Sequence, residues 1–143
     1  MLHVFTYGSL MFPEVWNIVV GREFETVAGT LTGYSIFRVE GAVFPGIIAS
    51  SAECSVKGLV YFDVDAASVE RLDRFEDDFY ARRSLAIDCT DGQRHAADAY
   101  TVPAKNRRVL TAEPWTAEKF VASGGLADFI ARFQGFSRLG GAG

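Results

Sequence analysis

Short segments rich in β-branched and aromatic residues recur along the chain, and tight turns rather than helical crossovers separate most of them. We expect strands over 2–7, 27–39, 43–48, 57–64, 85–89 and 96–102. The segment 27–39 is either one strand or a pair bent at Gly33, and Asp91-Gly92 suits a hairpin turn between the last two strands. This pattern predicts an α+β fold: a small mixed or antiparallel β-barrel with a few flanking helices.

Three helices are expected among these strands. Pro13 suits the start of a helix that continues to residue 20 and ends at Gly21. Asp65 caps a second helix that runs to about Glu76. Thr116 caps a C-terminal helix, interrupted at 124–125, with apolar residues Phe120, Phe129, Ile130 and Phe133.

The length of 143 residues fits one domain, with a core over about 1–103 and a helical tail over 104–143. The net charge of -4 disfavours nucleic acid as a partner. No secretory leader opens the chain, and no apolar run is long enough to cross a bilayer. We therefore expect a cytoplasmic protein that binds neither nucleic acid nor membrane; its oligomeric state stays open.

The cysteines and histidines give little sign of metal or nucleophilic chemistry. Cys54 and Cys89 are isolated in apolar contexts, which predicts two buried, reduced thiols. The chain has no CxxC pair and only two histidines, so we expect no zinc site. Neither His3 nor His95 has a Ser or Cys nucleophile as an obvious partner, so a catalytic triad has no support.

The first candidate site is Tyr7-Gly8-Ser9-Leu10, at the end of the first strand. Gly8 has no Cβ, so a ligand could approach the backbone closely there. The amides of Ser9 and Leu10 could point into a cavity as paired donors, and helix N-termini such as the one expected near Pro13 attract anions. These features predict a carboxylate or oxyanion site, and an ordinary tight turn is the alternative.

The second candidate is Glu76, which follows Val69 by seven residues and Leu72 by four. This spacing places Glu76 on the apolar stripe of the helix. Burial and the negative helix end should both raise its pKa, so that it can accept a proton near neutral pH and return it. The alternative is a frayed helix end with Glu76 in solvent.

A metal site is a further interpretation of the same region. The acids Asp73, Glu76, Asp77 and Asp78 could ligate an ion. Adjacent acids are more often part of a solvated loop, and neither His nor Asn lies nearby in sequence. We therefore favour a solvated loop here.

The order of several motifs resembles that of the γ-glutamylcyclotransferase-like superfamily, in particular its AIG2-like and γ-glutamylamine cyclotransferase branch. Tyr7-Gly8-Ser9-Leu10 after an N-terminal strand is similar to the YGSL motif of these proteins. Three further segments are similar to motifs of the family in the same order. Residues 43–47 are similar to its short Pro-containing strand, residues 72–76 followed by Tyr80 and Arg82 to a central motif, and residues 99–102 to a late strand that carries a tyrosine, here Tyr100. The similarity spans residues 2 to about 102, and the gap between Glu76 and Tyr80 is short.

The resemblance implies a cavity at one mouth of the barrel and a reaction that needs neither metal nor organic cofactor. In this family the α-amino group of a γ-glutamyl substrate attacks its own γ-carbonyl, which releases an amine and 5-oxoproline. The resemblance makes Glu76 the general acid/base, while the backbone of Gly8, Ser9 and Leu10 holds the γ-glutamyl group.

Three tyrosines complete the candidate site. The resemblance implies that Tyr7, Tyr80 and Tyr100 shape the pocket or donate hydrogen bonds to the substrate. Packing in the barrel is the alternative for each of them.

The functional hypothesis is therefore a cyclotransferase that acts on a γ-glutamyl amine or peptide, a small-molecule substrate. The alternative is a binding protein for γ-glutamyl-like small molecules that keeps the pocket but has little or no turnover. A metal-dependent hydrolase that uses the acidic cluster is a third, more distant interpretation. The sequence does not identify the leaving amine.

Overall fold

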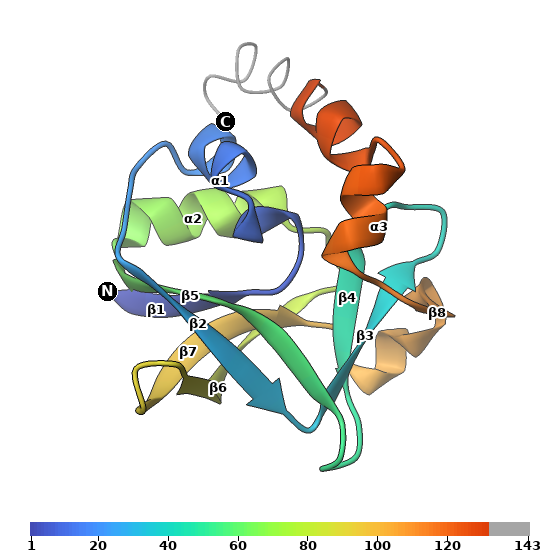
Figure 1. The fold of residues 1–143 in the computed structure, drawn as a ribbon, viewed down its shortest axis with the longest axis horizontal. Coiled ribbons are helices and arrows are strands. Elements are labelled where there is room, and N and C mark those ends of the chain that lie inside the picture. The colour runs from blue at the N-terminus through green and yellow to red at the C-terminus, as the bar shows by residue number, and fades with distance from the viewer. Residues whose placement is uncertain (132–143) are drawn as a thin grey trace.

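A closed barrel of five strands forms the centre of the fold (Figure 1). This computed structural model describes residues 1–131, so Phe133 lies outside the described residues. Around the barrel the order is β1 (Leu2–Thr6), β5 (Ser55–Val64), β2 (Thr26–Thr32), β6 (Ala81–Cys89) and β7 (Arg94–Thr101). Neighbours pair antiparallel except β7 and β1, which run parallel with Val4 beside Asp98. The predicted α+β barrel with mixed strand pairing is confirmed.

A second, three-stranded sheet lies beside the barrel. Its order is β4 (Pro45–Ala49), β3 (Tyr34–Val39) and β8 (Leu110–Pro114), and all pairs are antiparallel. Gly33 has a φ of 90°, which favours glycine, and the turn there sends β2 and β3 into different sheets. The alternative of a strand pair bent at Gly33 is therefore confirmed. Strand β8 was not predicted, because the C-terminal part was expected to be helical.

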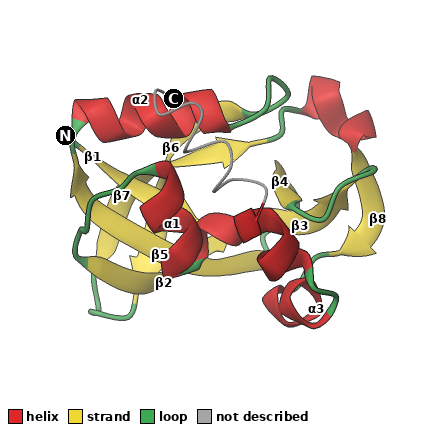
Figure 2. Ribbon diagram, turned by 90° about the horizontal axis from the view of Figure 1, so that it is seen from above, coloured by secondary structure: helices red, strands yellow, loops and turns green. Residues whose placement is uncertain are grey.

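The helices α1 (Pro13–Val19), α2 (Ala66–Phe75) and α3 (Ala117–Ala122) lie on one side of the strands, as Figure 1 and the view from above in Figure 2 show. The two short 3-10 helices are η1 (Ser9–Met11) and η2 (Ala104–Val109). Asp65 caps α2 by accepting from the Ser68 N–H at 3.3 Å, as predicted. None of the described helices has the length and apolar character that a bilayer crossing requires.

Residues 116–131 are closely packed against the rest of the fold. Thr116 caps α3 by accepting from the Lys119 N–H at 3.2 Å. A turn at Gly124, whose φ is 84°, separates α3 from the helical residues 125–131, so the predicted interruption is confirmed. Phe120 and Phe129 are buried in the same core cluster as residues of β1 and α1.

Two apolar cores share the barrel wall. The cluster inside the barrel includes Phe5, Val60 and Ile87. The other cluster fills the space between the barrel and the helices, where Trp16 stacks on Tyr61 with ring centroids 3.6 Å apart. Because the wall is covered on both faces, consecutive residues of β5 are buried in different clusters, Val60 inside the barrel and Tyr61 beneath the helices.

The two cysteines differ in their surroundings. Both are free thiols, and Cys89 is buried in the barrel core as predicted. The prediction of a buried thiol is wrong for Cys54, which is only partly buried. Cys54 lies in the turn before β5, where the hydroxyls of Ser50 and Ser51 each lie 3.5 Å from its sulfur.

The close pairing of β1 and β5 allows a test of the barrel geometry. A Cβ at Gly58 would meet the Thr6 carbonyl oxygen and lie 2.7 Å from a Phe5 ring carbon. Overpacking of this kind costs about 1–3 kcal/mol, so we expect Gly58→Ala to lower the free energy of unfolding by about 1 kcal/mol or more. Denaturant titration measures it, with Lys57→Ala on the exposed side of the same strand as the control. Equal stability of Gly58→Ala and wild type would contradict this packing.

Candidate active site

A cavity of about 320 Å³ lies where the end of β1, the end of α2 and the helical residues 125–131 meet. This volume is in the range of small-molecule sites, about 300–1,000 Å³. The seven residues predicted from the sequence all line this one cavity: Tyr7, Gly8, Ser9, Leu10, Glu76, Tyr80 and Tyr100. The structure therefore brings together side chains that lie up to 93 residues apart in sequence.

Glu76 lies one residue beyond the end of α2, and its backbone is already extended, with φ -80° and ψ 144°. Its N–H donates to the Leu72 carbonyl at 3.1 Å, which closes the last helical turn. Val69 and Leu72 bury the face of α2 that packs on the core. Their position on the helix directs the chain so that Glu76 faces the cavity rather than bulk solvent.

The environment of Glu76 favours its neutral form. Glu76 keeps some accessible surface because it faces the cavity, but the protein encloses it on the other sides. This burial, with smaller effects from the charges of Asp77 and Asp73, raises the pKa of the Glu76 carboxyl to about 8. A carboxyl with this pKa exchanges a proton readily near neutral pH.

The loop after β1 lies on the same cavity. Gly8 precedes the 3-10 helix Ser9–Met11, and its carbonyl accepts from the Met11 N–H at 3.0 Å. The first N–H groups of a helix have no partner within it. The Tyr61 hydroxyl donates to the Leu10 carbonyl at 2.9 Å and so holds the loop against the core.

The structure gives a different reason for Gly8 than close approach of a ligand. A Cβ at Gly8 would lie 2.9 Å from two ring carbons of Pro45, the first residue of β4. Gly8 therefore allows Pro45 to pack against the backbone. This contact joins the loop after β1 to segment 41–45, which forms the adjoining wall of the cavity.

Each of the three tyrosines donates its hydroxyl proton to a protein acceptor. Tyr7 donates to the Tyr100 carbonyl, and Tyr80 donates to the Pro45 carbonyl. Tyr100 donates to Asp73 Oδ1 at 2.6 Å. A hydroxyl has one proton to give, so these side chains shape the cavity wall and offer lone pairs rather than protons to a ligand. Burial is the main cause that raises the pKa of all three phenols above the ordinary value.

Asp73 has a structural role that sequence reasoning missed. Besides accepting from Tyr100, it pairs with Arg82 Nε at 3.0 Å, and Arg82 also pairs with Asp98 at 2.7 Å. Asp73 is therefore part of a network that fixes Tyr100 at the cavity. The interpretation of Asp73 as only a solvated acid is wrong, because β6 and β7 bring Arg82 and Tyr100 to it.

The C-terminal segment supplies part of the cavity wall that was not predicted. Gly125, Asp128 and Phe129 all line the cavity. Phe129 is an apolar residue at helical spacing, which predicts packing but not a position at a site. The lining includes the acids Glu76, Asp77 and Asp128, and it includes neither Lys nor Arg among the described residues.

The acidic stretch does not gather into a metal site. Within residues 1–131, the group of ligand atoms that converges closely enough for one ion consists of Cys89, Asp91 and His95, on the β6–β7 hairpin. The carboxylates of Asp73, Glu76, Asp77 and Asp78 form no such group in the same range.

Comparison with known proteins gives the family of this chain. Residues 4–117 match the family model described as γ-glutamyl cyclotransferase, AIG2-like. The match covers more than half of the chain, so the chain belongs to this family. The resemblance on which the site prediction was based is thereby confirmed.

Individual relatives agree with this membership. The chain is 35% identical over 91 residues to AIG2-like protein D of Arabidopsis thaliana, and the match covers 64% of this chain and 59% of that protein. The match thus spans about three-fifths of the relative's length. A solution structure of another Arabidopsis thaliana protein has a TM-score of 0.69 at 29% identity and covers 96% of this chain and 91% of that one.

A solved structure of a γ-glutamyl cyclotransferase has a TM-score of 0.57 and 14% identity, with coverage of 71% of this chain and 66% of that one. At this identity the likeness concerns the fold alone.

The environment of Glu76 can be tested without a substrate. Carbon NMR of carboxyl-labelled protein should give Glu76 a titration midpoint near 8. Because the Asp77 charge contributes to the raised pKa, Asp77→Asn should lower the midpoint. Asp78→Asn is the matched control and should leave the midpoint in place. A wild-type midpoint near the ordinary 4.5 would contradict the buried position of the carboxyl.

Proposed function

We propose that this protein is a cyclotransferase that converts a γ-glutamyl amine or γ-glutamyl peptide into 5-oxoproline and the free amine. The observation that carries the proposal is Glu76, a carboxyl with a pKa of about 8 in the cavity that the Gly8–Leu10 backbone also lines. Membership of the γ-glutamyl cyclotransferase, AIG2-like family supports it.

In the first step, the Glu76 carboxylate takes a proton from the substrate α-ammonium. The freed nitrogen attacks the γ-carbonyl carbon of the same molecule, and the π electron pair of that carbonyl moves to its oxygen. A five-membered ring forms with a tetrahedral carbon. The backbone of Gly8, Ser9 and Leu10 holds the γ-glutamyl group and donates hydrogen bonds to its oxygens. Because the nucleophile and the electrophile belong to one molecule, a cavity that holds the substrate curled supplies much of the rate enhancement.

In the second step, Glu76 returns the proton to the leaving nitrogen. The carbonyl double bond re-forms from the electron pair on the oxygen as the bond between the γ-carbon and this nitrogen breaks, and the pair of the broken bond stays on the nitrogen. The ring nitrogen keeps one hydrogen, and the remaining proton ends on the released amine. One carboxyl can serve both steps, because a group whose pKa lies near the working pH can both accept a proton and release it.

The charge of the cavity favours certain leaving amines. The lining acids Asp77 and Asp128 lie on the exposed side, and the described lining residues include neither Lys nor Arg. A leaving amine with a second positive charge is stabilised by Coulomb attraction to these acids, whereas one with a carboxylate is destabilised by repulsion. The cavity therefore favours cationic leaving amines over anionic ones.

The proposed role of Glu76 predicts the behaviour of Glu76→Gln. This variant keeps the size of the side chain but cannot transfer a proton. We expect 5-oxoproline formation to fall by about 10²- to 10⁴-fold, the usual contribution of a general acid/base. The measurement is release of 5-oxoproline from the best substrate found in a screen of γ-glutamyl compounds.

A thermal melt separates loss of chemistry from loss of fold. The pKa of Glu76 rises on folding from its ordinary 4.5 to about 8, so the folded protein binds a proton that the unfolded chain has released at intermediate pH. Stability therefore falls as the pH rises through this window, and Glu76→Gln removes that loss. The variant should melt at or above wild type near pH 8. Unchanged turnover in Glu76→Gln would defeat the mechanism.

Binding measurements distinguish this proposal from the alternative of a binding protein with little or no turnover. Glu76→Gln should still bind γ-glutamyl compounds. Wild-type protein that binds these compounds but forms no 5-oxoproline from any of them would favour the alternative.

A matched set of substrates tests the charge preference. The γ-glutamyl derivatives of diaminobutane, butylamine and γ-aminobutyrate differ mainly in the charge at the end of the leaving amine. Because an exposed charge pair gives up to about 1 kcal/mol, kcat/KM should fall roughly two- to tenfold from the cationic to the anionic compound. Asp128→Asn should reduce this ratio, and a preference for the anionic compound would contradict the argument.

A further inference from the structure

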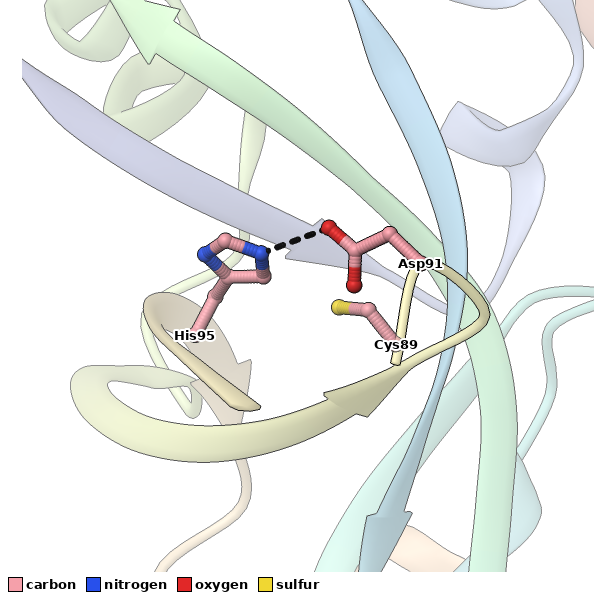
Figure 3. Close-up of side chains that lie close together, drawn as sticks. All are labelled: Cys89, Asp91 and His95. Atoms are coloured by element: carbon pink, nitrogen blue, oxygen red, sulfur yellow. Dashed lines mark hydrogen bonds and ion pairs between the residues drawn. The ribbon is translucent and has the colours of Figure 1, made fainter. Parts of the chain in front are cut away.

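The β6–β7 hairpin carries three different metal-ligating side chains at one end of the barrel, away from the cavity. Figure 3 shows Cys89, Asp91 and His95 with their ligand-bearing ends turned toward one another. His95 Nε2 lies 2.9 Å from Asp91 Oδ2, and the three ligand atoms all lie within 4.8 Å of one another. None of these side chains lines the cavity that contains Glu76.

Local contacts hold each ligand in place before any ion binds. The second Asp91 oxygen, Oδ1, accepts from the Gln93 N–H at 2.9 Å, which leaves Oδ2 directed at His95. Gly92 has a φ of 84°, which allows the tight turn that brings the two strand ends together. Partners of this kind orient first-sphere ligands in metal sites.

The rings around His95 restrict its orientation. Phe62 meets the His95 ring edge to face with centroids 4.9 Å apart, and His3 meets it likewise at 6.0 Å. His3 Nδ1 accepts from the Asp63 N–H at 3.2 Å and so belongs to the surrounding wall. His95 is thus confined to a position in which Nε2 faces Asp91.

The sulfur ligand lies on the inner side of the cluster. Cys89 is buried in the barrel core, and a Cβ at Gly29 would lie 3.3 Å from its Sγ, so glycine leaves room beside the sulfur. Burial and the charges of Asp91 and Asp88 raise the pKa of the Cys89 thiol, whereas the His95 backbone N–H lowers it. A divalent cation beside the sulfur would oppose the first two effects.

We propose that Cys89, Asp91 and His95 form a binding site for Zn²⁺, with solvent in the fourth position. The combination of a thiolate, an imidazole and a carboxylate suits Zn²⁺, whereas Mg²⁺ and Ca²⁺ take oxygen ligands. Asp91 is exposed, so the ion has a route from solvent and an open side for a water ligand.

Binding changes the protonation of the cluster in a defined way. The Cys89 thiol releases its proton to solvent and binds as a thiolate. His95 binds through Nε2 in the tautomer that is protonated on Nδ1, and Asp91 binds through Oδ2 in place of its hydrogen bond to His95. The ion then connects the end of β6 to β7. It stabilises the folded hairpin, because the unfolded chain has no preformed site and the ion therefore binds the folded chain.

Cobalt provides a direct test, since Co²⁺ occupies zinc sites and a cobalt–thiolate bond gives a near-ultraviolet charge-transfer band. The reduced protein of 143 residues, titrated with Co²⁺, should develop this band with one ion per chain, and Zn²⁺ should abolish it. Zn²⁺ should also raise the melting temperature. Absence of the band in wild-type protein would overturn the proposal.

Variants identify the ligands. Cys89→Ser should lose the charge-transfer band, whereas Cys54→Ser should keep it. Removal of a side chain that only hydrogen-bonds to a metal ligand already lowers metal affinity by about 10- to 100-fold. Removal of a ligand itself, in His95→Gln or Asp91→Asn, should therefore weaken Co²⁺ binding by at least about 10-fold. Asp88→Asn also removes a negative charge near the Cys89 sulfur but removes no proposed ligand, so it is the matched control for Asp91→Asn and should weaken Co²⁺ binding much less.

Two controls keep the result independent of folding and of the proposed enzymatic activity. Metal-free melts should show that each variant is folded before titration. A band that persists in Cys89→Ser and disappears in Cys54→Ser would assign the cobalt to the other thiol and overturn the proposal. The experiment uses neither Glu76 nor a substrate, so failure of the metal site and failure of the cyclotransferase proposal are separate outcomes.

Discussion

The parallel pairing of β7 with β1 closes the barrel, and the arrangement of the cavity depends on it. Strand β1 leads directly into Tyr7 and the loop that follows, and β7 carries Tyr100 near its end. Their pairing places the Tyr7 hydroxyl on the Tyr100 carbonyl, while the Tyr100 hydroxyl reaches Asp73 on α2. The same closure therefore connects the loop, the barrel wall and the helix that ends at Glu76.

This arrangement places Glu76 where it is costly to ionise. Tyr7 is buried beside it, and the Tyr7 proton is given to a carbonyl rather than to the carboxyl. The nearby charges that affect the pKa of Glu76 are those of Asp77 and Asp73, and both raise it. Burial and these charges thus destabilise the ionised form of Glu76, a cost that a neutral side chain at this position would not have. Groups with a perturbed pKa in a cavity are typical of functional positions.

Much of the fold and of the cavity could be predicted because local patterns determine it. The apolar and aromatic run 59–62 identifies β5, the cap at Asp65 identifies α2, and the spacing from Leu72 identifies Glu76. Strand β8 could not be identified in this way, because its extended conformation depends on pairing with β3. Asp128 likewise gives no signal: it occupies an exposed helical position, and only the packing of Phe129 places it at the cavity.

A single carboxyl faces opposite demands in the proposed reaction, since it must first be ionised and then be protonated. With a pKa of about 8, most of the Glu76 population is neutral at pH 7, and the ionised fraction is roughly a tenth. A substrate ammonium beside Glu76 favours the ionised form by its positive charge, so bound substrate itself prepares the base. Once the ammonium has given its proton to Glu76, its positive charge is gone, and the buried carboxyl holds that proton until the leaving amine takes it. The burial that opposes ionisation in the empty cavity therefore assists the second step.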